Sequence, residues 1–440
     1  MREESVLKPL VKLSLPVMFA LLIQSFYNIA DSFFVAKVSE NALTALSIIY
    51  PLQLLLNAIA NGTAIGINTL VSRYFGMGRK KKVKSPLKTG LMLMGISYVV
   101  FAVITVGTLK LFFQFSTDVP ETVSYGLEYG YIVFSFSIFV FLESMFTKVL
   151  QAKEDMVTPM KGQVAGAIVN IVLDPILIFV LGFGVKGAAI ATVLGQAVAA
   201  IIVALEAKKV FEWNGKVTIR AVKDIYYAAI PQIILQSLYT VYIMGLNIIL
   251  VDFGEEAVTV LGIYYKLQSF FFIPETGFMQ VLIPVVSYHY GAGNKDMILN
   301  MCKASIFMVG GFMFLVMCTF MAIPETLIGI FSQNHEVKAI GSVALRIISI
   351  SFVPSAIVFM LMTFLQATDN GVKSIVLAVL RQLLLLVPLA WVFSHAGLKY
   401  TWCTFPVTEI IVMTTAIVMY FMVKKELTER FKNRVKKAAV

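Results

Sequence analysis

The chain alternates long apolar segments with short stretches that are rich in charged residues, glycine or proline. A helix rises about 1.5 Å per residue, so each apolar segment is long enough to cross the hydrocarbon core of a bilayer. The segments predict twelve transmembrane helices, at about residues 13–36, 44–70, 89–113, 124–148, 162–182, 185–207, 225–251, 257–286, 301–323, 337–365, 374–394 and 400–423. The pattern therefore predicts an all-α membrane protein.

The sequence also repeats itself at a constant offset of 215 residues, which places Pro16 on Pro231, Gln53 on Gln268 and Gly182 on Gly397. Two copies of a six-helix unit explain this offset. Because six is even, both copies enter the membrane from the same side, so an axis along the membrane normal relates two parallel lobes. The predicted parts are an N-terminal lobe (1–207), a cytoplasmic inter-lobe linker (208–222), a C-terminal lobe (223–423) and a basic cytoplasmic tail (424–440).

Composition excludes a soluble domain. Only 14% of the residues are charged and the mean hydropathy is +0.85, whereas soluble domains are about 25% charged. The net charge of +11 comes from lysines and arginines that gather in the tail and in alternate loops. The positive-inside rule then places both termini in the cytoplasm. We expect a multi-pass protein of the bacterial inner (plasma) membrane. We expect membrane lipids, rather than nucleic acid, to be the partners of these basic residues.

A polar stripe marks the first apolar segment. Gln24, Tyr27, Asn28 and Asp31 follow one another at i, i+3, i+4 and i+7, a spacing that puts them on one face of a helix. A carboxylate inside a membrane span is costly and usually faces an ion or substrate path. We therefore interpret Asp31 as a functional residue.

Polar residues also follow one face of the fifth span, where Gln163, Asn170 and Asp174 are spaced for a helix and Pro175 predicts a kink beside the acid. The sixth span carries Thr192 and Gln196 at i, i+4. Counted along the helices, the acids and Thr192 all fall in the outer half of the membrane. The groups are therefore expected to converge.

The repeat provides a control for these residues. At the 215-residue offset, the positions of Asn28, Asp31, Asn170, Asp174 and Thr192 are occupied by Ile243, Leu246, Leu385, Leu389 and Val407. The second lobe thus builds the same positions from apolar residues. The fold does not require the polar groups, which favours a functional role.

Other ionisable residues inside the spans give weaker signals. Glu275 in span eight is the best second-lobe candidate for contact with a cationic substrate. Glu143 and Lys148 lie near the cytoplasmic end of span four, where snorkelling is an equally good explanation. No role is assigned to Lys266, Arg346 and Glu409.

The chain resembles the multidrug and toxic compound extrusion (MATE) family over nearly its whole length. The resemblance is carried by the run Tyr27–Val35, by Asn170-x-x-x-Asp174-Pro175 and by the paired glycine turns at Gly76–Gly78 and Gly291–Gly293. The polar first-lobe set is similar to that of the DinF-like branch. That resemblance implies a cation-coupling cluster of Asp31, Asn170, Asp174 and Thr192, with Tyr27 beside them. From the polar stripes we expect Gln24, Tyr27, Asn28, Gln163 and Gln196 to support the cavity.

The resemblance implies a secondary active exporter of cationic, amphipathic compounds that runs on inward flow of H⁺ or Na⁺. No cofactor, resident metal or catalytic residue is expected, although the oxygens of the cation-coupling cluster also suit Na⁺. We expect a monomer. Two nearby carboxylates resist being ionised together, so proton uptake at Asp31 and Asp174 would change the bonding between spans one, five and six and release substrate.

Three alternatives stay open. A dedicated exporter of one metabolite or peptide differs only in cargo. A flippase for lipid-linked precursors would share the lobes, but a strongly cationic cavity and extra spans are not obvious here. An intramembrane enzyme is disfavoured because His289, His335 and His395 lie near span ends, away from Asp31.

Overall fold

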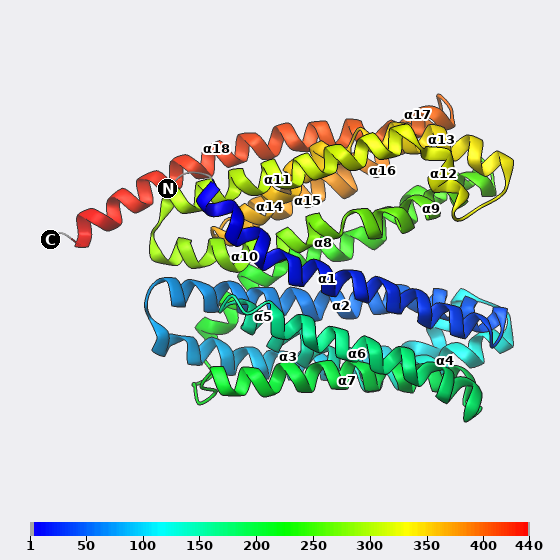
Figure 1. Cartoon of the computed structure of the whole chain (residues 1–440), viewed down its shortest axis with the longest axis horizontal. Coiled ribbons are helices and arrows are strands. Elements are labelled where there is room, and N and C mark those ends of the chain that lie inside the picture. Colours follow the sequence, from blue (N-terminus) through cyan, green and yellow to red (C-terminus); the bar gives the residue numbers. More distant parts are fainter. Residues whose placement is uncertain (1–3, 439–440) are drawn as a thin grey trace. The chain divides into compact units, whose positions relative to one another are not determined.

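The computed structural model describes residues 4–438, and every regular element in that part of the chain is a helix (Figure 1). Among residues 4–438, nine helices are long and apolar enough to cross a membrane, and three bent helix pairs bring the total to twelve spans if each pair is one span. The prediction of an all-α membrane protein with twelve spans is confirmed. The ends of the predicted first lobe and tail, residues 1–3 and 439–440, lie outside the described residues.

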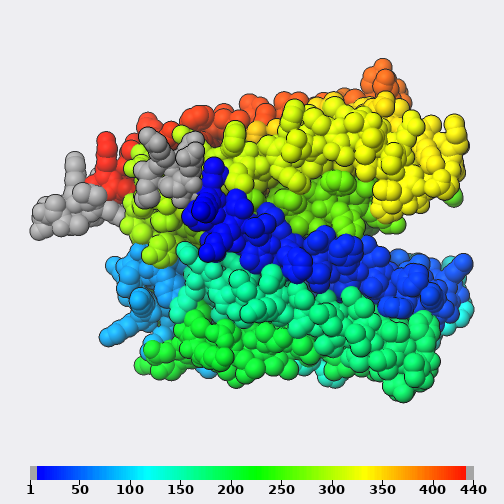
Figure 2. Space-filling view, in the orientation of Figure 1, coloured from blue at the N-terminus to red at the C-terminus, as the bar shows by residue number. Residues whose placement is uncertain are grey.

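The chain forms two compact units, and the first comprises Leu15–Ile233. Its helices are α1 (Glu4–Ala36, from residue 15), α2 (Glu40–Gly76), α3 (Lys84–Ser116), α4 (Pro120–Ser135), α5 (Ile138–Gln151), α6 (Val157–Pro175), α7 (Gly184–Val210) and the start of α8 (Ile219–Val251). Within this unit α6 packs along α7, and α5 packs against α7 and α2. The side chains of α6 and α7 form a continuous surface in the space-filling view (Figure 2).

The second unit holds the remaining described residues, up to Ser14 and from Ile234 onward. Its further helices are α9 (Glu255–Phe271), α10 (Ile273–Ala292), α11 (Lys295–Ala322), α12 (Pro324–Gly329), α13 (His335–Ser349), α14 (Phe352–Ala367), α15 (Gly371–Val379), α16 (Val387–Ser394), α17 (Leu398–Trp402) and α18 (Thr404–Ala438). Here α14 is central and packs against α10, α11 and α18. The boundary between the two units falls inside α1 and α8.

Backbone turns recur at the repeat distance. Gly78 (φ 68°) and Gly293 (φ 78°) are both left-handed and lie 215 residues apart, as are Glu154 (φ 64°) and Asp369 (φ 70°). Residues other than glycine rarely adopt this conformation. Its occurrence at matching positions supports the duplication that the sequence offset predicts.

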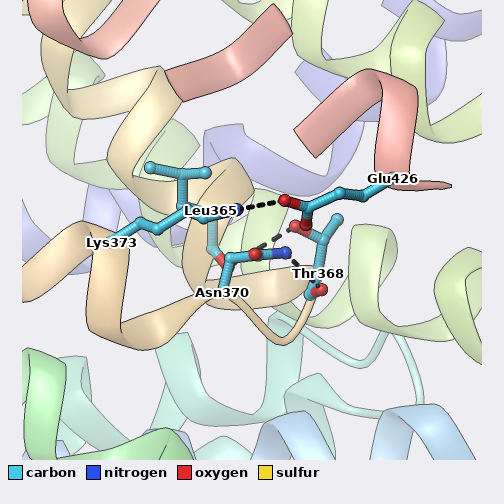
Figure 3. Close-up of polar contacts among 5 residues, drawn as sticks. All are labelled: Leu365, Thr368, Asn370, Lys373 and Glu426. Carbon is cyan, nitrogen blue, oxygen red and sulfur yellow. Dashed lines mark hydrogen bonds and ion pairs between the residues drawn. The ribbon is translucent and has the colours of Figure 1, made fainter. Parts of the chain in front are cut away.

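The turn after α14 shows how such a junction is held (Figure 3). The backbone N–H of Asn370 donates to the carbonyl of Leu365 at 2.9 Å, and its side chain donates to the carbonyl of Thr368 at 3.0 Å. Lys373, at the start of α15, pairs with Glu426 of α18 at 2.8 Å. The two hydrogen bonds of Asn370 satisfy carbonyls at the end of α14 that have no helical partners, and the ion pair joins the start of α15 to α18.

Three spans are bent, which the hydropathy pattern does not reveal. The bends between α4 and α5 (46°) and between α13 and α14 (47°) occur at equivalent places in the repeat. The bend of 52° between α9 and α10 has no such equivalent, because α2 is one continuous helix. Pro274 lies in the first turn of α10 and removes a backbone donor there.

The predicted linker segment, residues 208–222, contacts helices of the first unit through Trp213. The chain is not helical between Val210 and Ile219. The ring of Trp213 lies 5.4 Å from that of Phe146, and its indole N–H donates to the carbonyl of Ala207 at 3.4 Å. This segment is therefore packed against the helices of the first unit.

Candidate functional site

Asp174 is the most deeply buried acid of the first unit. It lies near the end of α6, and its relative exposure is 0%. Neither of its carboxylate oxygens has a hydrogen-bond partner among the residues that the structure describes. Burying an ionised carboxylate without hydrogen-bond partners costs several kcal/mol of stability in proteins. A proton on Asp174, or a cation bound to it, would remove this cost.

Asn170, one turn earlier on α6, faces Thr192 of α7. Its side-chain N–H donates to the hydroxyl of Thr192 at 3.4 Å, and both residues are buried. Its amide oxygen is buried and has no partner in the described part of the chain. Asn170 and Asp174 together thus present three oxygens that can accept a proton or hold a cation.

Two glycines set the distance between these helices. A Cβ on Gly166 would lie 2.6 Å from the carbonyl oxygen of Gly195, and a Cβ on Gly195 would lie 2.6 Å from that of Gly166. Small residues let helix backbones approach closely in membranes. Since a Cβ on Gly195 would also come within 3.2 Å of Asn170 Cβ, this contact positions Asn170 against Thr192.

We expect Gly195→Ala to separate α6 from α7, to lower the apparent melting temperature and to impair transport. A backbone carbonyl cannot rotate away, and overpacking of this kind costs about 1–3 kcal/mol. Thermal unfolding in detergent and a transport assay measure the two effects. Gly95→Ala is the matched control, because a Cβ there meets nothing within 4 Å. Equal behaviour of the two variants would show that the close contact is unimportant.

Pro175 marks a change of helix winding beside the acid. The expected kink takes the form of a π-helical turn at Ile176–Val180, in which the N–H of Leu181 donates to the carbonyl of Ile176 at 2.9 Å. Such turns are rare and frequent at functional sites. The start of α7 packs closely on this turn, since a Cβ on Gly187 would lie 2.7 Å from Leu177.

Asp31 on α1 belongs to the same cluster. It lies within electrostatic range of Asp174, and one of its oxygens is buried without a partner among the described residues. Tyr27, one turn earlier, is within electrostatic range of both acids and of Glu143. The structure therefore brings together Asp31, Asp174, Asn170, Thr192 and Tyr27.

The remaining predicted residues lie at the margin of this cluster. Gln24 and Asn28 are exposed, whereas Gln196 is half-buried. The side-chain oxygen of Gln196 is buried with no partner in the described chain. Gln163 donates to the carboxylate of Glu143 at 3.4 Å, which joins it to α5.

Sequence reasoning missed Tyr129 on α4. Its side chain is buried, and its hydroxyl is hydrogen-bonded to Thr192 and to Gln53, the latter at 3.5 Å. The 215-residue offset provides a signal that would have found it, because Ala344 occupies the equivalent position. Tyr129 adds a second polar contact to Thr192, besides that of Asn170.

Glu143 and Lys148 make hydrogen bonds to other side chains of the first unit. The carboxylate of Glu143 accepts a hydrogen bond from Thr147 at 2.9 Å, in addition to that from Gln163. Lys148 is buried and donates to the side chain of Gln151 at 2.9 Å. With Tyr27 in electrostatic range of Glu143, polar side chains continue from Asp31 and Asp174 toward the end of α5 that carries Lys148.

In the second unit, Glu275 is buried in the first turn of α10, and one of its oxygens has no partner among the described residues. Lys266 and Arg346 are exposed. No group of three or more His, Cys, Asp and Glu residues suited to a metal ion occurs in the described part of the chain.

Comparison with known proteins connects this arrangement to a family. The multidrug export protein MepA of Staphylococcus haemolyticus (strain JCSC1435) is 24% identical over 436 residues, covering 97% of this chain and 96% of the relative. MepA of Staphylococcus aureus (strain NCTC 8325 / PS 47) is 25% identical with the same coverage. The structure of a Vibrio cholerae MATE transporter, solved as an aspartate-to-asparagine variant, has a TM-score of 0.92 at 20% identity and covers 96% of this chain and 98% of its own.

The sequence model of the MatE family matches the chain twice, at residues 16–176 and 231–392, so the second match begins 215 residues after the first. Members of this family are transporters and not enzymes. The two matches cover most of the chain and confirm the resemblance seen in the sequence motifs. The chain belongs to the MatE family of membrane transporters.

Proposed function

We propose that this protein exports cationic, amphipathic organic compounds from the cell in exchange for inward-moving protons, with sodium as the alternative coupling ion. The observation that carries the proposal is the fully buried Asp174, whose two oxygens have no partner among the described residues, within electrostatic range of Asp31. The MepA relatives are named multidrug export proteins, which supports organic compounds as cargo.

Asp31, Asp174, Asn170 and Thr192 are the proposed cation-coupling residues. Two nearby carboxylates resist being ionised together, so one proton readily occupies the pair. A proton on Asp31 or Asp174 turns an acceptor oxygen into a donor. Because these residues lie on α1, α6 and α7, the change alters hydrogen bonding between three helices, and the π-helical turn after Pro175 provides a place where α6 can change its winding.

The direction of coupling follows from which side supplies the proton. Protons that enter from outside bind the acids, the substrate is released outward, and the protons leave to the cytoplasm. If one proton enters for each monovalent cation that leaves, no net charge crosses the membrane and only the pH difference drives export. If both acids take up protons, one net charge moves inward, and the membrane potential adds about 2.3 kcal/mol per 100 mV.

Efflux from proteoliposomes tests the proposal. Tetraphenylphosphonium is loaded, and a pH gradient, a sodium gradient and a valinomycin-set potential are imposed separately. We expect the pH gradient to drive efflux. If only the sodium gradient drives efflux, the coupling ion is Na⁺ bound at the same oxygens. If neither gradient drives efflux, antiport is excluded.

The proposed orientation rests on the distribution of basic residues, and the proposed monomer rests on the position of the polar clusters. Both termini are placed in the cytoplasm because lysines and arginines gather in the tail and in alternate loops. Anionic lipids are the proposed contacts of these basic residues, and the working unit is taken as a monomer because each polar cluster is contained within one unit of a single chain.

A further inference from the structure

A second buried charge cluster, which we name the Glu–Arg–Glu cluster, consists of Glu275, Arg381 and Glu409 in the second unit. The guanidinium of Arg381 donates through Nε to Glu409 Oε1 at 2.6 Å, and a second nitrogen contacts the same oxygen at 2.5 Å. The side chains of Arg381 and Glu409 are only 13% and 4% exposed. Glu275 lies within electrostatic range of both partners.

Two members of the cluster, Glu275 and Arg381, lie where the regular α-helix is interrupted. Glu275 lies in the first turn of α10, directly after the 52° bend, where the N-terminus of a helix favours negative charge. Arg381 lies on the π-helical turn Leu380–Leu386, which packs against α18, the helix that carries Glu409. Interrupted helices are the usual place for substrate and ion sites in transporters.

The cluster is confined to the second unit. At the 215-residue offset, Glu275, Arg381 and Glu409 correspond to Ala60, Gly166 and Leu194. The first unit therefore builds the shared fold without these three charges. As with Asp31 and Asp174, a purely structural role does not explain their presence.

The charges do not balance. Arg381 pairs with Glu409 through Oε1, whereas no ion pair of Glu275 occurs in the described chain. One oxygen of each glutamate is buried without a hydrogen-bond partner among the described residues. With all three groups ionised, the cluster carries one surplus negative charge. A buried charge that lacks compensation is costly, so the cluster favours a ligand that supplies one positive charge.

Aromatic rings lie beside the surplus charge. Tyr264 is within electrostatic range of all three members of the cluster. Its ring centroid lies 5.3 Å from that of Tyr265 and 5.5 Å from that of Phe405, while Arg381 covers the ring of Phe359 at 4.6 Å. Aromatic faces attract organic cations, most strongly where water is excluded.

We propose that the Glu–Arg–Glu cluster binds an aromatic organic monocation at Glu275, and that Arg381 sets the preference for one charge by neutralising Glu409. This inference deepens the proposed export function by assigning a charge class to its substrate. A dication bound at Glu275 leaves one buried positive charge uncompensated. Without Arg381, two carboxylates face the ligand and a dication balances them.

Binding measurements in detergent test this without any ion gradient. The probes are tetraphenylphosphonium, a monocation, and dequalinium, an aromatic dication. We expect Arg381→Gln to shift the ratio of their dissociation constants toward the dication by at least about tenfold. Arg381→Lys keeps the charge and is expected to keep the preference. Arg346→Gln, which removes an exposed arginine of the same unit, is the matched control.

The double variant Arg381→Gln/Glu409→Gln restores one surplus negative charge and is expected to restore the preference for the monocation. An unchanged ratio in Arg381→Gln, or a double variant that behaves like the single one, would overturn the inference. If Arg381→Gln does not fold, the double variant and Glu275→Gln decide: monocation binding must persist in the first and fall at least about tenfold in the second. An antiport failure in proteoliposomes with an intact charge preference would overturn the proposed coupling and leave this inference standing.

Discussion

Replacing Asp31 by Asn is expected to abolish substrate accumulation driven by a pH gradient while leaving the protein folded. A pH difference of one unit supplies about 1.4 kcal/mol per proton, which supports an accumulation ratio of about tenfold. Asparagine keeps the size of the side chain but cannot take up a proton. The steady-state ratio in the variant is therefore expected to fall to about one, because Asp174 alone does not form the carboxylate pair through which the gradient acts.

Initial efflux rates at several external pH values provide the second readout. In the wild-type protein, protons from outside drive substrate release, so the rate rises as the external pH falls. In Asp31→Asn the rate becomes independent of external pH. Asp224→Asn is the control, because its side chain is 43% exposed and its ion pair with Arg220, at 4.0 Å, lies at the surface. Normal export by both Asp31→Asn and Asp174→Asn would remove these residues from the coupling mechanism.

Asp174→Leu is expected to inactivate coupled export and, at the same time, to raise the apparent melting temperature. The acid is completely buried and its oxygens have no partners among the described residues. The second unit carries leucine at the equivalent position, Leu389. An apolar residue thus fits the shared fold and removes the cost of burying an unpaired polar group.

Thermal unfolding of purified protein, followed by the transport assay, separates the two effects. Asp174→Asn is the comparison variant, since it removes the charge but keeps a polar group that needs partners. A lower melting temperature for Asp174→Leu would contradict this interpretation and would show that the carboxylate stabilises the fold. The expected combination, a more stable but inactive transporter, is typical of a functional polar group in an apolar core.

The first-unit cluster was predictable because its residue types are rare inside membrane spans. Asp31 and Asp174 differ from their apolar counterparts at the 215-residue offset, and the spacing of Asn170 and Asp174 places them on one helix face. The twelve spans were predictable from hydropathy for the same physical reason, since charged residues are excluded from the lipid-facing core. Both predictions depend on local composition, which a single sequence shows directly.

The same offset singles out Glu275, Arg381 and Glu409, but the pairing within this second-unit cluster was not predictable because it depends on tertiary contacts. Arg381 lies within an apolar span, 28 residues before its partner Glu409, and nothing local indicates that they meet. The bend before Glu275 was also missed, because hydropathy is the same for straight and bent spans. The contact between Gly166 and Gly195 likewise requires knowledge of how two helices face each other.

The separation of Arg381 from Glu409 has a consequence for how the chain is made. The span Gly371–Ser394 is strongly apolar, with a hydropathy of 2.3, so it can enter the bilayer despite its arginine. During synthesis, however, that arginine arrives before α18 has left the ribosome, and an arginine at the centre of a span costs about 2.5–3.5 kcal/mol on insertion scales. The growing chain thus holds an unpaired guanidinium until its last helix is in place. We expect chains truncated before Glu409 to be degraded by membrane quality control, because only the final helix supplies the carboxylate that neutralises Arg381.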